Sequence, residues 1–299
     1  MPHGQAAIDV TVRCCTNSGH SVETWEPLPI MESATTVRHP KGAIEERPGS
    51  GAGPFLGAVV ESSVGSKVLV ALTGTGLVSF VLFHMIGNLK FLSGEPDSIN
   101  GYAYFLKHDL GALIWIARAG LLGIFVLHLA LAIRLKRRAL AARPIAYSFP
   151  GSAQASVASR TMIWTGIAIL LFTLFHLAHY TFAWVKLASV PDGAGNMIAM
   201  NYLDLTDSKG RQNVYEMMVA GFSNGPLVVL YLVAQLFLFV HLRHGIPSAF
   251  QTLGLKNARF RKAIDFLGLA IALTILAGNV AIVLAVQFGY VKSKLGGAL

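Results

Sequence analysis

Charged residues are scarce in this sequence, and cysteines are almost absent. Charged side chains make up 13% of the 299 residues, about half their share in an average soluble protein, whereas 54% of the residues are hydrophobic. The only two cysteines, Cys14 and Cys15, are adjacent, which excludes a disulfide framework and a cysteine-ligated metal or iron–sulfur site within the chain. The composition excludes a disordered or secreted disulfide-rich protein and favours a membrane protein.

The first 61 residues differ in composition from the rest of the chain. They contain seven acidic and four basic residues, six of the twelve prolines, and no apolar run long enough for a helix or a signal sequence. We therefore expect residues 1–61 to be a flexible cytoplasmic tail, with Met31 as an alternative start. Residues 62–299 contain twenty basic and eight acidic residues, so the net charge of +9 divides into −3 for the tail and +12 for the remainder.

Five continuous apolar stretches follow the tail. Each is long enough to cross about 30 Å of hydrocarbon as a helix, and their continuous rather than alternating hydrophobicity excludes strands. The sequence therefore predicts an all-α fold, an integral membrane bundle of five helices with no evident internal repeat. The expected spans are about 66–92, 110–134, 160–186, 225–245 and 263–289.

Basic residues indicate which loops face the cytoplasm. The loops 134–160 and 243–262 hold most of the basic residues between the spans, whereas the other two loops hold few of them and most of the acidic residues. By the positive-inside rule the two basic loops are cytoplasmic, so the N-terminus is expected inside and the C-terminus outside. Because the cations belong to short loops between apolar runs, the high pI does not indicate nucleic-acid binding.

Four histidines lie well inside four different spans, where an ionisable side chain needs a specific reason. His84 and His176 lie about 12 and about 15 Å from the outer face, counted at the helical rise per residue, and are called the outer pair. His128 and His241 lie in the inner halves of their spans and are called the inner pair. Two facing imidazoles at one depth are the ligand set of a low-spin b-type haem, so the pattern predicts two haems, one above the other.

Other assignments of these histidines remain open. His179 follows His176 by three residues and His244 follows His241 by three, so each shares a helix face with the preferred ligand but lies nearer the helix end. A single intramembrane histidine is also typical of a helix-to-helix hydrogen bond or a proton relay.

Basic residues near the span ends are candidate partners for haem propionates. Arg118 lies within the second span, level with the outer pair, and needs an anionic partner there, with Asp109 as the alternative to a propionate. The full set of candidates is Arg118, Lys67, Arg160 and Arg243.

Several motifs surround the histidines. They are SVGSK at 63–67, ALTG at 71–74, FHMIGNL at 83–89, LHLALAIR at 127–134, FHLAH at 175–179, HLRHG at 241–245 and SAFQTLG at 248–254. Taken together, they resemble the four haem helices of the cytochrome b558 membrane-anchor subunit of succinate dehydrogenase and fumarate reductase. The resemblance extends from residue 62 to about residue 290.

The resemblance implies a five-helix, di-haem anchor for a flavoprotein subunit and an iron–sulfur subunit, in the inner (cytoplasmic) membrane of the cell. Succinate would be oxidised on the flavoprotein and not on this chain. Electrons would pass from the iron–sulfur subunit to the inner haem at His128 and His241, then to the outer haem at His84 and His176, and on to a quinone, usually menaquinone. The related fumarate reductases run the reaction in reverse.

The quinone site and the function itself have alternatives. The acidic quinone-site residue of the fumarate reductase branch has no unambiguous match, and the candidates are Asp109, His108 and Asn88. Haem b subunits of formate dehydrogenases and hydrogenases would not account for QTLG at 251–254 or for five spans, and cytochromes of the bc1 type carry two ligands on each of two helices. A transporter with a histidine proton relay would hold no haem.

Overall fold

The structure, a computed structural model, describes residues 55–142, 157–185, 189–191, 197–199 and 201–294. Within these residues the fold is helical, apart from an antiparallel hairpin of β1 (Ser189–Pro191) and β2 (Met197–Ala199), in which Ser189 pairs with Ala199. Five helical segments are long and apolar enough to span a membrane: Ser63–Ser93, Ala112–Ala141, Arg160–Thr181, Gly225–Thr252 and Arg261–Gln287. The prediction of an all-α fold with five membrane-length helices is therefore confirmed.

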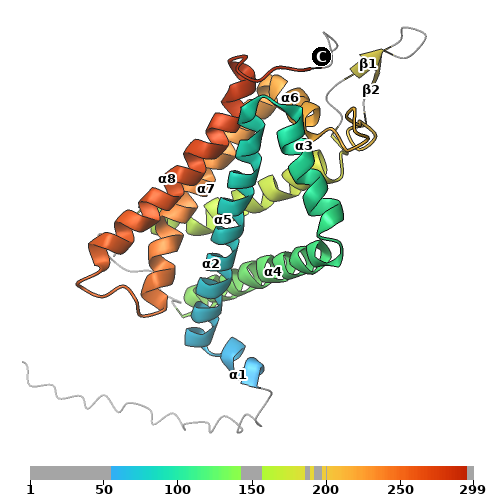
Figure 1. Cartoon of the computed structure of the whole chain (residues 1–299). Helices are drawn as coiled ribbons and strands as arrows, with labels where there is room; N and C mark the ends of the chain where they lie inside the picture. The colour runs from blue at the N-terminus through green and yellow to red at the C-terminus, as the bar shows by residue number, and fades with distance from the viewer. Residues whose placement is uncertain (1–54, 143–156, 186–188, 192–196, 200, 295–299) are drawn as a thin grey trace, which may run out of the picture. The chain divides into compact units, whose positions relative to one another are not determined.

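The α-helices follow one another along the chain as Figure 1 shows. They are α1 (Phe55–Glu61), α2 (Ser63–Asn88), α3 (Pro96–Tyr104), α4 (Ala112–Ala141), α5 (Val157–His176), α6 (Val214–Ser223), α7 (Gly225–Thr252) and α8 (Arg261–Gln287). A 3₁₀ turn, η1 (Leu89–Ser93), follows α2, and π-helical turns, η2 (Phe105–Asp109) and η3 (Leu177–Thr181), follow α3 and α5. Residues 1–54 of the predicted tail lie outside the described residues, and its last seven residues form α1.

Side-chain caps explain where two of the long helices begin. The Ser62 hydroxyl accepts a hydrogen bond from the Gly65 amide at the start of α2, at 3.3 Å. The Asn224 side chain accepts from the Leu227 amide at the start of α7, at 3.2 Å. Serine and asparagine are favoured at these positions because a helix leaves its first amides without intrahelical partners.

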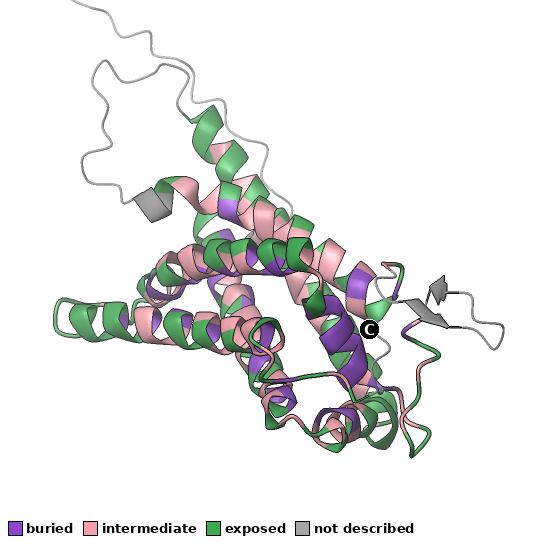
Figure 2. Ribbon diagram, turned by 90° about the horizontal axis from the view of Figure 1, so that it is seen from above, coloured by how far each residue is buried: buried purple, intermediate pink, exposed green. Residues whose placement is uncertain are grey.

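The best-packed part of the molecule surrounds α6. Residues 215–222 of this helix are all buried, as the purple ribbon in Figure 2 indicates, and they pack with residues of α7, α8 and η1. The helices α7 and α8 lie side by side (Figure 1), and Gly268 of α8 faces Pro247 of α7. A Cβ atom on Gly268 would lie 2.8 Å from the proline ring, so glycine permits the close approach of the two helices.

The helix α4 has the opposite character. Leu131 is its only buried residue, and Trp115, Ile116 and Leu122 are 67%, 68% and 63% exposed. It contacts α2 along part of its length. A long apolar helix with so little protein cover is typical of a segment that faces lipid.

Candidate metal centre: two pairs of histidines

His128 of α4 faces α2 and is held there by its Nδ1 atom. Nδ1 lies 3.1 Å from the hydroxyl oxygen of Thr73 and 3.2 Å from the carbonyl oxygen of Val70. The Thr73 hydroxyl donates its own proton to the carbonyl of Leu69 at 2.7 Å. Because a carbonyl can only accept, and a hydroxyl that has already donated can only accept, Nδ1 of His128 carries the ring proton. The Nε2 atom therefore keeps its lone pair.

His241 of α7 is held by α5 in the same way. Its Nδ1 atom lies 3.0 Å from the Thr165 hydroxyl, which donates back to the carbonyls of Thr161 and Met162 at 3.2 and 3.1 Å. Within the part of the chain that the structure describes, neither inner-pair Nε2 atom makes a hydrogen bond. A neutral imidazole with a protonated, hydrogen-bonded Nδ1 and a free Nε2 is the form that binds a metal.

A glycine follows each of these threonines and lies against the histidine ring. A Cβ atom on Gly74 would lie 3.1 Å from Cε1 of His128, and one on Gly166 would lie 3.6 Å from Cε1 of His241. The first distance is shorter than an ordinary carbon–carbon contact and the second is ordinary. Thus α2 and α5 each approach the Cε1 atom of an inner-pair histidine with a residue that has no side chain.

The helices α2 and α5 share a short repeat. Residues 73–84 read TGTGLVSFVLFH and residues 165–176 read TGIAILLFTLFH, with identity at six positions, including the first two and the last. In each helix the Thr-Gly pair contacts an inner-pair histidine on another helix, and the last residue is an outer-pair histidine. This repeat corrects the expectation that the spans carry none, and it is the sequence signal that identifies the threonines.

The outer-pair rings lie beside each other. The ring centroids of His84 and His176 are 5.9 Å apart, and their planes are perpendicular at 88°. Phe80 stacks on His84 at 5.4 Å, and Phe172 lies on His176 at 5.8 Å, so the repeat places a phenylalanine one turn before each outer ligand. Metal–nitrogen bonds of about 2 Å would place the centroids of two opposed imidazoles roughly 6 Å apart. The observed centroid distance is close to this value.

The polar neighbours of the outer pair differ from those of the inner pair. The Asn88 amide nitrogen donates to Nε2 of His84 at 3.1 Å, so a metal at this nitrogen would replace the amide. The hydroxyl of Tyr231 lies 3.3 Å from Nδ1 of His176 and 2.9 Å from Nδ1 of His179, and so links the two histidines of η3 and α5. The outer pair has no threonine partner among the described residues.

The alternative ligands, His179 and His244, have different surroundings. His179 is wholly buried, and a Cβ atom on Gly221 of α6 would lie 3.0 Å from its Cε1 and 3.2 Å from its Nε2. The helix α6 thus covers the ring edge that a metal would need. His244 lines a hollow of about 140 Å³ together with Lys256 and Asp265, which form an ion pair at 2.5 Å.

Two histidines at each position fit a metal ion whose remaining ligands come from a cofactor and not from the protein. No group of three or more histidine, cysteine, aspartate or glutamate side chains that could hold a metal ion occurs among the described residues. A pair of imidazoles satisfies only the two axial positions of a six-coordinate iron, which is the arrangement that haem requires. The residues present therefore fit a bis-histidine haem better than a protein-only metal cage.

The candidate propionate partners are all exposed. The guanidinium of Arg118 lies over the ring of Trp115 at 4.8 Å, and within the described residues it forms no ion pair with Asp109. Arg243 borders the hollow beside His244. The exposed candidates are Lys67, Arg118, Arg160 and Arg243.

Only one of the candidate quinone-site residues lies beside the outer pair. Asn88 contacts His84, as described above. His108 stacks on Tyr104 at 4.3 Å and Asp109 ends η2, and both side chains are exposed. In the described ranges no contact joins either of them to an outer-pair ring.

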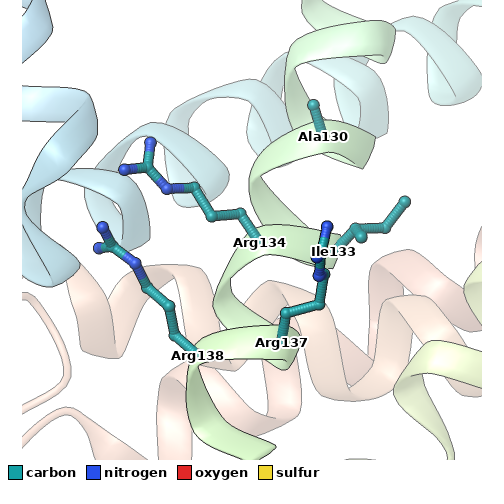
Figure 3. Close-up of a pocket in the computed structure, with 5 residues that line it drawn as sticks. All are labelled: Ala130, Ile133, Arg134, Arg137 and Arg138. Carbon is teal, nitrogen blue, oxygen red and sulfur yellow. The ribbon is translucent and has the colours of Figure 1, made fainter. Parts of the chain in front are cut away.

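The end of α4 that follows His128 is strongly basic. Arg134, Arg137 and Arg138 line a hollow of about 290 Å³ whose remaining lining is Ala130 and Ile133, with Arg134 and Arg138 projecting on the same side (Figure 3). Arg138 donates to the carbonyl of Glu61, at the end of α1, at 2.7 Å.

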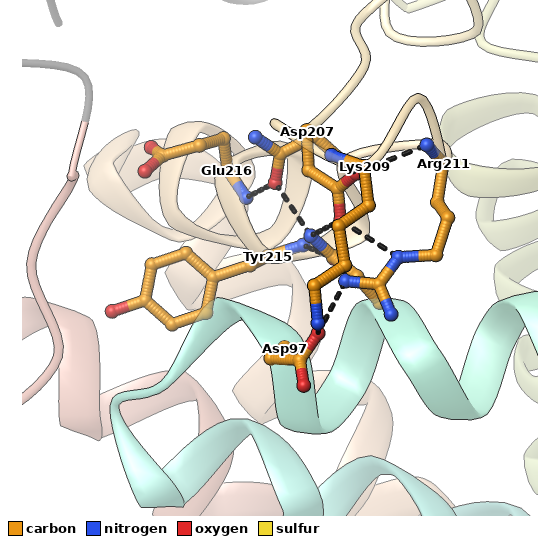
Figure 4. Close-up of polar contacts among 8 residues, drawn as sticks. Asp97, Asp207, Lys209, Arg211, Tyr215 and Glu216 are labelled. Atoms are coloured by element: carbon orange, nitrogen blue, oxygen red, sulfur yellow. Dashed lines mark hydrogen bonds and ion pairs between the residues drawn. The ribbon is translucent and has the colours of Figure 1, made fainter.

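A polar cluster attaches the segment 201–213 to α3 (Figure 4). The Arg211 guanidinium lies 2.5 Å from a carboxylate oxygen of Asp97 and 2.7 Å from one of Asp207. Asn100, which is wholly buried, donates to Asp207 at 3.3 Å and accepts from the Tyr215 amide at 2.9 Å. Burial opposes ionisation of Asp207, but hydrogen bonds from Arg211, the Lys209 amide and Asn100 outweigh it and lower the pKa to about 2. The cluster orders the connection between the third and fourth spans.

No known protein family, curated protein or solved structure matches this chain. The resemblance described above therefore rests on the motifs around the histidines.

Proposed function

We propose that the chain is the di-haem membrane anchor of a succinate:quinone oxidoreductase and carries electrons between an iron–sulfur subunit and a membrane quinone. The observation that carries the proposal is that four membrane-length helices each hold a histidine, of which His84 and His176 lie side by side. The rings of His84 and His176 are 5.9 Å apart, and threonines leave the Nε2 atoms of His128 and His241 free. When bound, two b-type haems supply reversible one-electron chemistry.

The chain's own residues would bind and orient the two haems. The inner pair, His128 and His241, would hold one haem iron and the outer pair, His84 and His176, the other, and the apolar spans would exclude water around them. The basic candidates would balance the charge of the propionates: Arg118, Lys67, Arg160 and Arg243.

The basic end of the bundle is the proposed docking side for the iron–sulfur and flavoprotein subunits. It lies in the cytoplasm by the positive-inside rule, which gives an inside N-terminus and an outside C-terminus in the inner membrane. Arg134, Arg137 and Arg138, on the same helix as His128, support this side (Figure 3). The two haems would supply an electron path from the inner pair to the outer pair. The acceptor would be a quinone, for which we propose menaquinone, near Asn88, with His108 and Asp109 as further candidates.

One contact supports a second candidate function. The Tyr231 hydroxyl bridges the Nδ1 atoms of His176 and His179, and such a hydrogen-bonded chain suits the histidine proton relay of a transporter. A haem b subunit of the formate dehydrogenase or hydrogenase type would share the ligands and differ in its soluble partners.

Single histidine variants of the detergent-purified chain test the proposal. We expect His84→Ala and His176→Ala to lose the same haem, and His128→Ala and His241→Ala to lose the other. His244→Ala is the matched control, because it lies on the same helix as His241, and it should retain both haems. Loss of both haems in every variant with normal yield, or retention of both in all four, would contradict the pairing. Soluble subunits that co-purify with the wild-type chain then distinguish succinate dehydrogenase from the other oxidoreductases.

A further inference from the structure

The inner-pair histidines are supported by the same arrangement on two different helices. Thr73 of α2 lies 3.1 Å from Nδ1 of His128, and Thr165 of α5 lies 3.0 Å from Nδ1 of His241. Both threonines are buried, at 7% and 4% exposure, and each occupies the first position of the repeat. Because the same threonine–histidine contact occurs on two different helices, chance does not explain it.

Other threonines of the same helices show what is distinctive about this pair. Thr75 of α2 donates to the Ala71 carbonyl at 2.9 Å, and Thr173 of α5 donates to the Ile169 carbonyl at 2.8 Å. Neither hydroxyl touches a histidine within the described residues. Donation to the backbone is thus the usual behaviour of a threonine in these helices. Of these four threonines, Thr73 and Thr165 also use their remaining lone pairs to accept from an imidazole.

We propose that Thr73 and Thr165 are positioning residues that fix the tautomer and orientation of the inner ligands and tune the inner haem. This inference rests on the proposed function. Each hydroxyl accepts the Nδ1 proton, in His128 together with the Val70 carbonyl at 3.2 Å, so Nε2 alone would be available to the iron. A hydrogen bond from Nδ1 to an oxygen also makes the imidazole a stronger electron donor. Stronger donation favours the ferric state and therefore lowers the reduction potential of the inner haem.

The outer pair should not respond to these residues, because Asn88 and Tyr231 are its polar neighbours. The outer haem therefore serves as an internal reference in the same protein. The two haems are assigned by the loss of each in the histidine variants.

The test is a potentiometric titration of the wild-type chain and of Thr73→Val and Thr165→Val, which keep the side-chain shape and remove the hydroxyl. We expect each variant to shift the inner-haem potential in the positive direction and to weaken inner-haem retention by about 10- to 100-fold, with the outer haem unchanged. The matched controls Thr75→Val and Thr173→Val remove a hydroxyl from the same helices and should leave both potentials in place. Thr73→Ser and Thr165→Ser restore the acceptor and should restore the wild-type potential.

Three results would overturn the inference. They are unchanged inner-haem potential and content in both valine variants, an equal shift in the Thr75 and Thr173 controls, and a shift confined to the outer haem. All three presuppose a wild-type chain with two haems. A wild-type chain without haem would instead overturn the proposed function, so the two failures are distinguishable.

Discussion

The substitution Gly74→Ala perturbs the inner pair at its most crowded point. The new Cβ atom would lie 3.1 Å from Cε1 and 3.5 Å from Nδ1 of His128, several tenths of an ångström inside an ordinary contact. The ring cannot move away without lengthening the hydrogen bonds of its Nδ1 atom to Thr73 and Val70, at 3.1 and 3.2 Å. Overpacking of this kind costs about 1–3 kcal/mol.

The repeat supplies the matched control, Gly166→Ala. Its Cβ atom would lie 3.6 Å from Cε1 of His241, which is an ordinary contact. Both substitutions gain the same helix propensity, roughly 1 kcal/mol, so this gain cancels when the two variants are compared. The remaining steric difference corresponds to roughly 5- to 150-fold weaker inner-haem retention in Gly74→Ala.

The assay is the transfer of haem from the detergent-purified variants to an excess of a haem-binding acceptor protein, followed by absorption. We expect Gly74→Ala to lose its inner haem first and Gly166→Ala to behave as the wild type. Equal retention by the two variants, or faster loss from Gly166→Ala, would refute the steric reasoning.

Three further predictions concern the polar cluster and the packing of α8. Arg211→Ala removes the counter-charge of Asp207, whose side chain is 8% exposed, and should destabilise the protein by about 2 kcal/mol, measured by thermal unfolding and by faster proteolysis of the segment 201–213. The pKa of Asp207 in the folded protein, about 2, lies below its ordinary value, so the ionised side chain stabilises the fold above about pH 4. This stabilisation, about 1 kcal/mol once solvent screening of the charges is allowed for, is lost as the pH falls toward 2. A thermal unfolding temperature that does not change with pH in this window would contradict the lowered pKa. Gly278→Ala would overlap the sulfur of buried Met85 and should cost about 1–3 kcal/mol of stability and disturb the outer haem more than the inner one, measured by thermal unfolding and haem content.

The apolar pattern was sufficient to predict the five long helices, but their ends depend on other residues. The predicted second span ended at Arg134, whereas α4 continues to Ala141, because the leucine, lysine, arginine and alanine residues that follow favour a helix in water as well. The predicted third span was one helix to residue 186, whereas α5 ends at His176 and a π-helical turn follows. Helix termini depend on such local preferences and on capping, to which a hydropathy pattern is insensitive.

In the candidate site, too, some features could be predicted from the sequence and others depend on how the helices pack. The four histidines were identifiable because an imidazole in a membrane span is costly and needs a partner. The Thr73–His128 hydrogen bond could not be identified from the sequence, because it joins residues 55 positions apart and depends on how α2 and α4 are rotated against each other. The cluster of Asn100, Asp207 and Arg211 was missed for a similar reason, since it forms only when the segment 201–213 reaches α3.

The central claim is that two haems lie between two pairs of histidines, and the haem-to-protein ratio of the purified chain tests it most directly. The measurement is a reduced-minus-oxidised absorption spectrum together with an independent determination of protein. The account predicts a b-type α-band and two haems per chain. A colourless chain, folded and purified from cells that make haem, would contradict it.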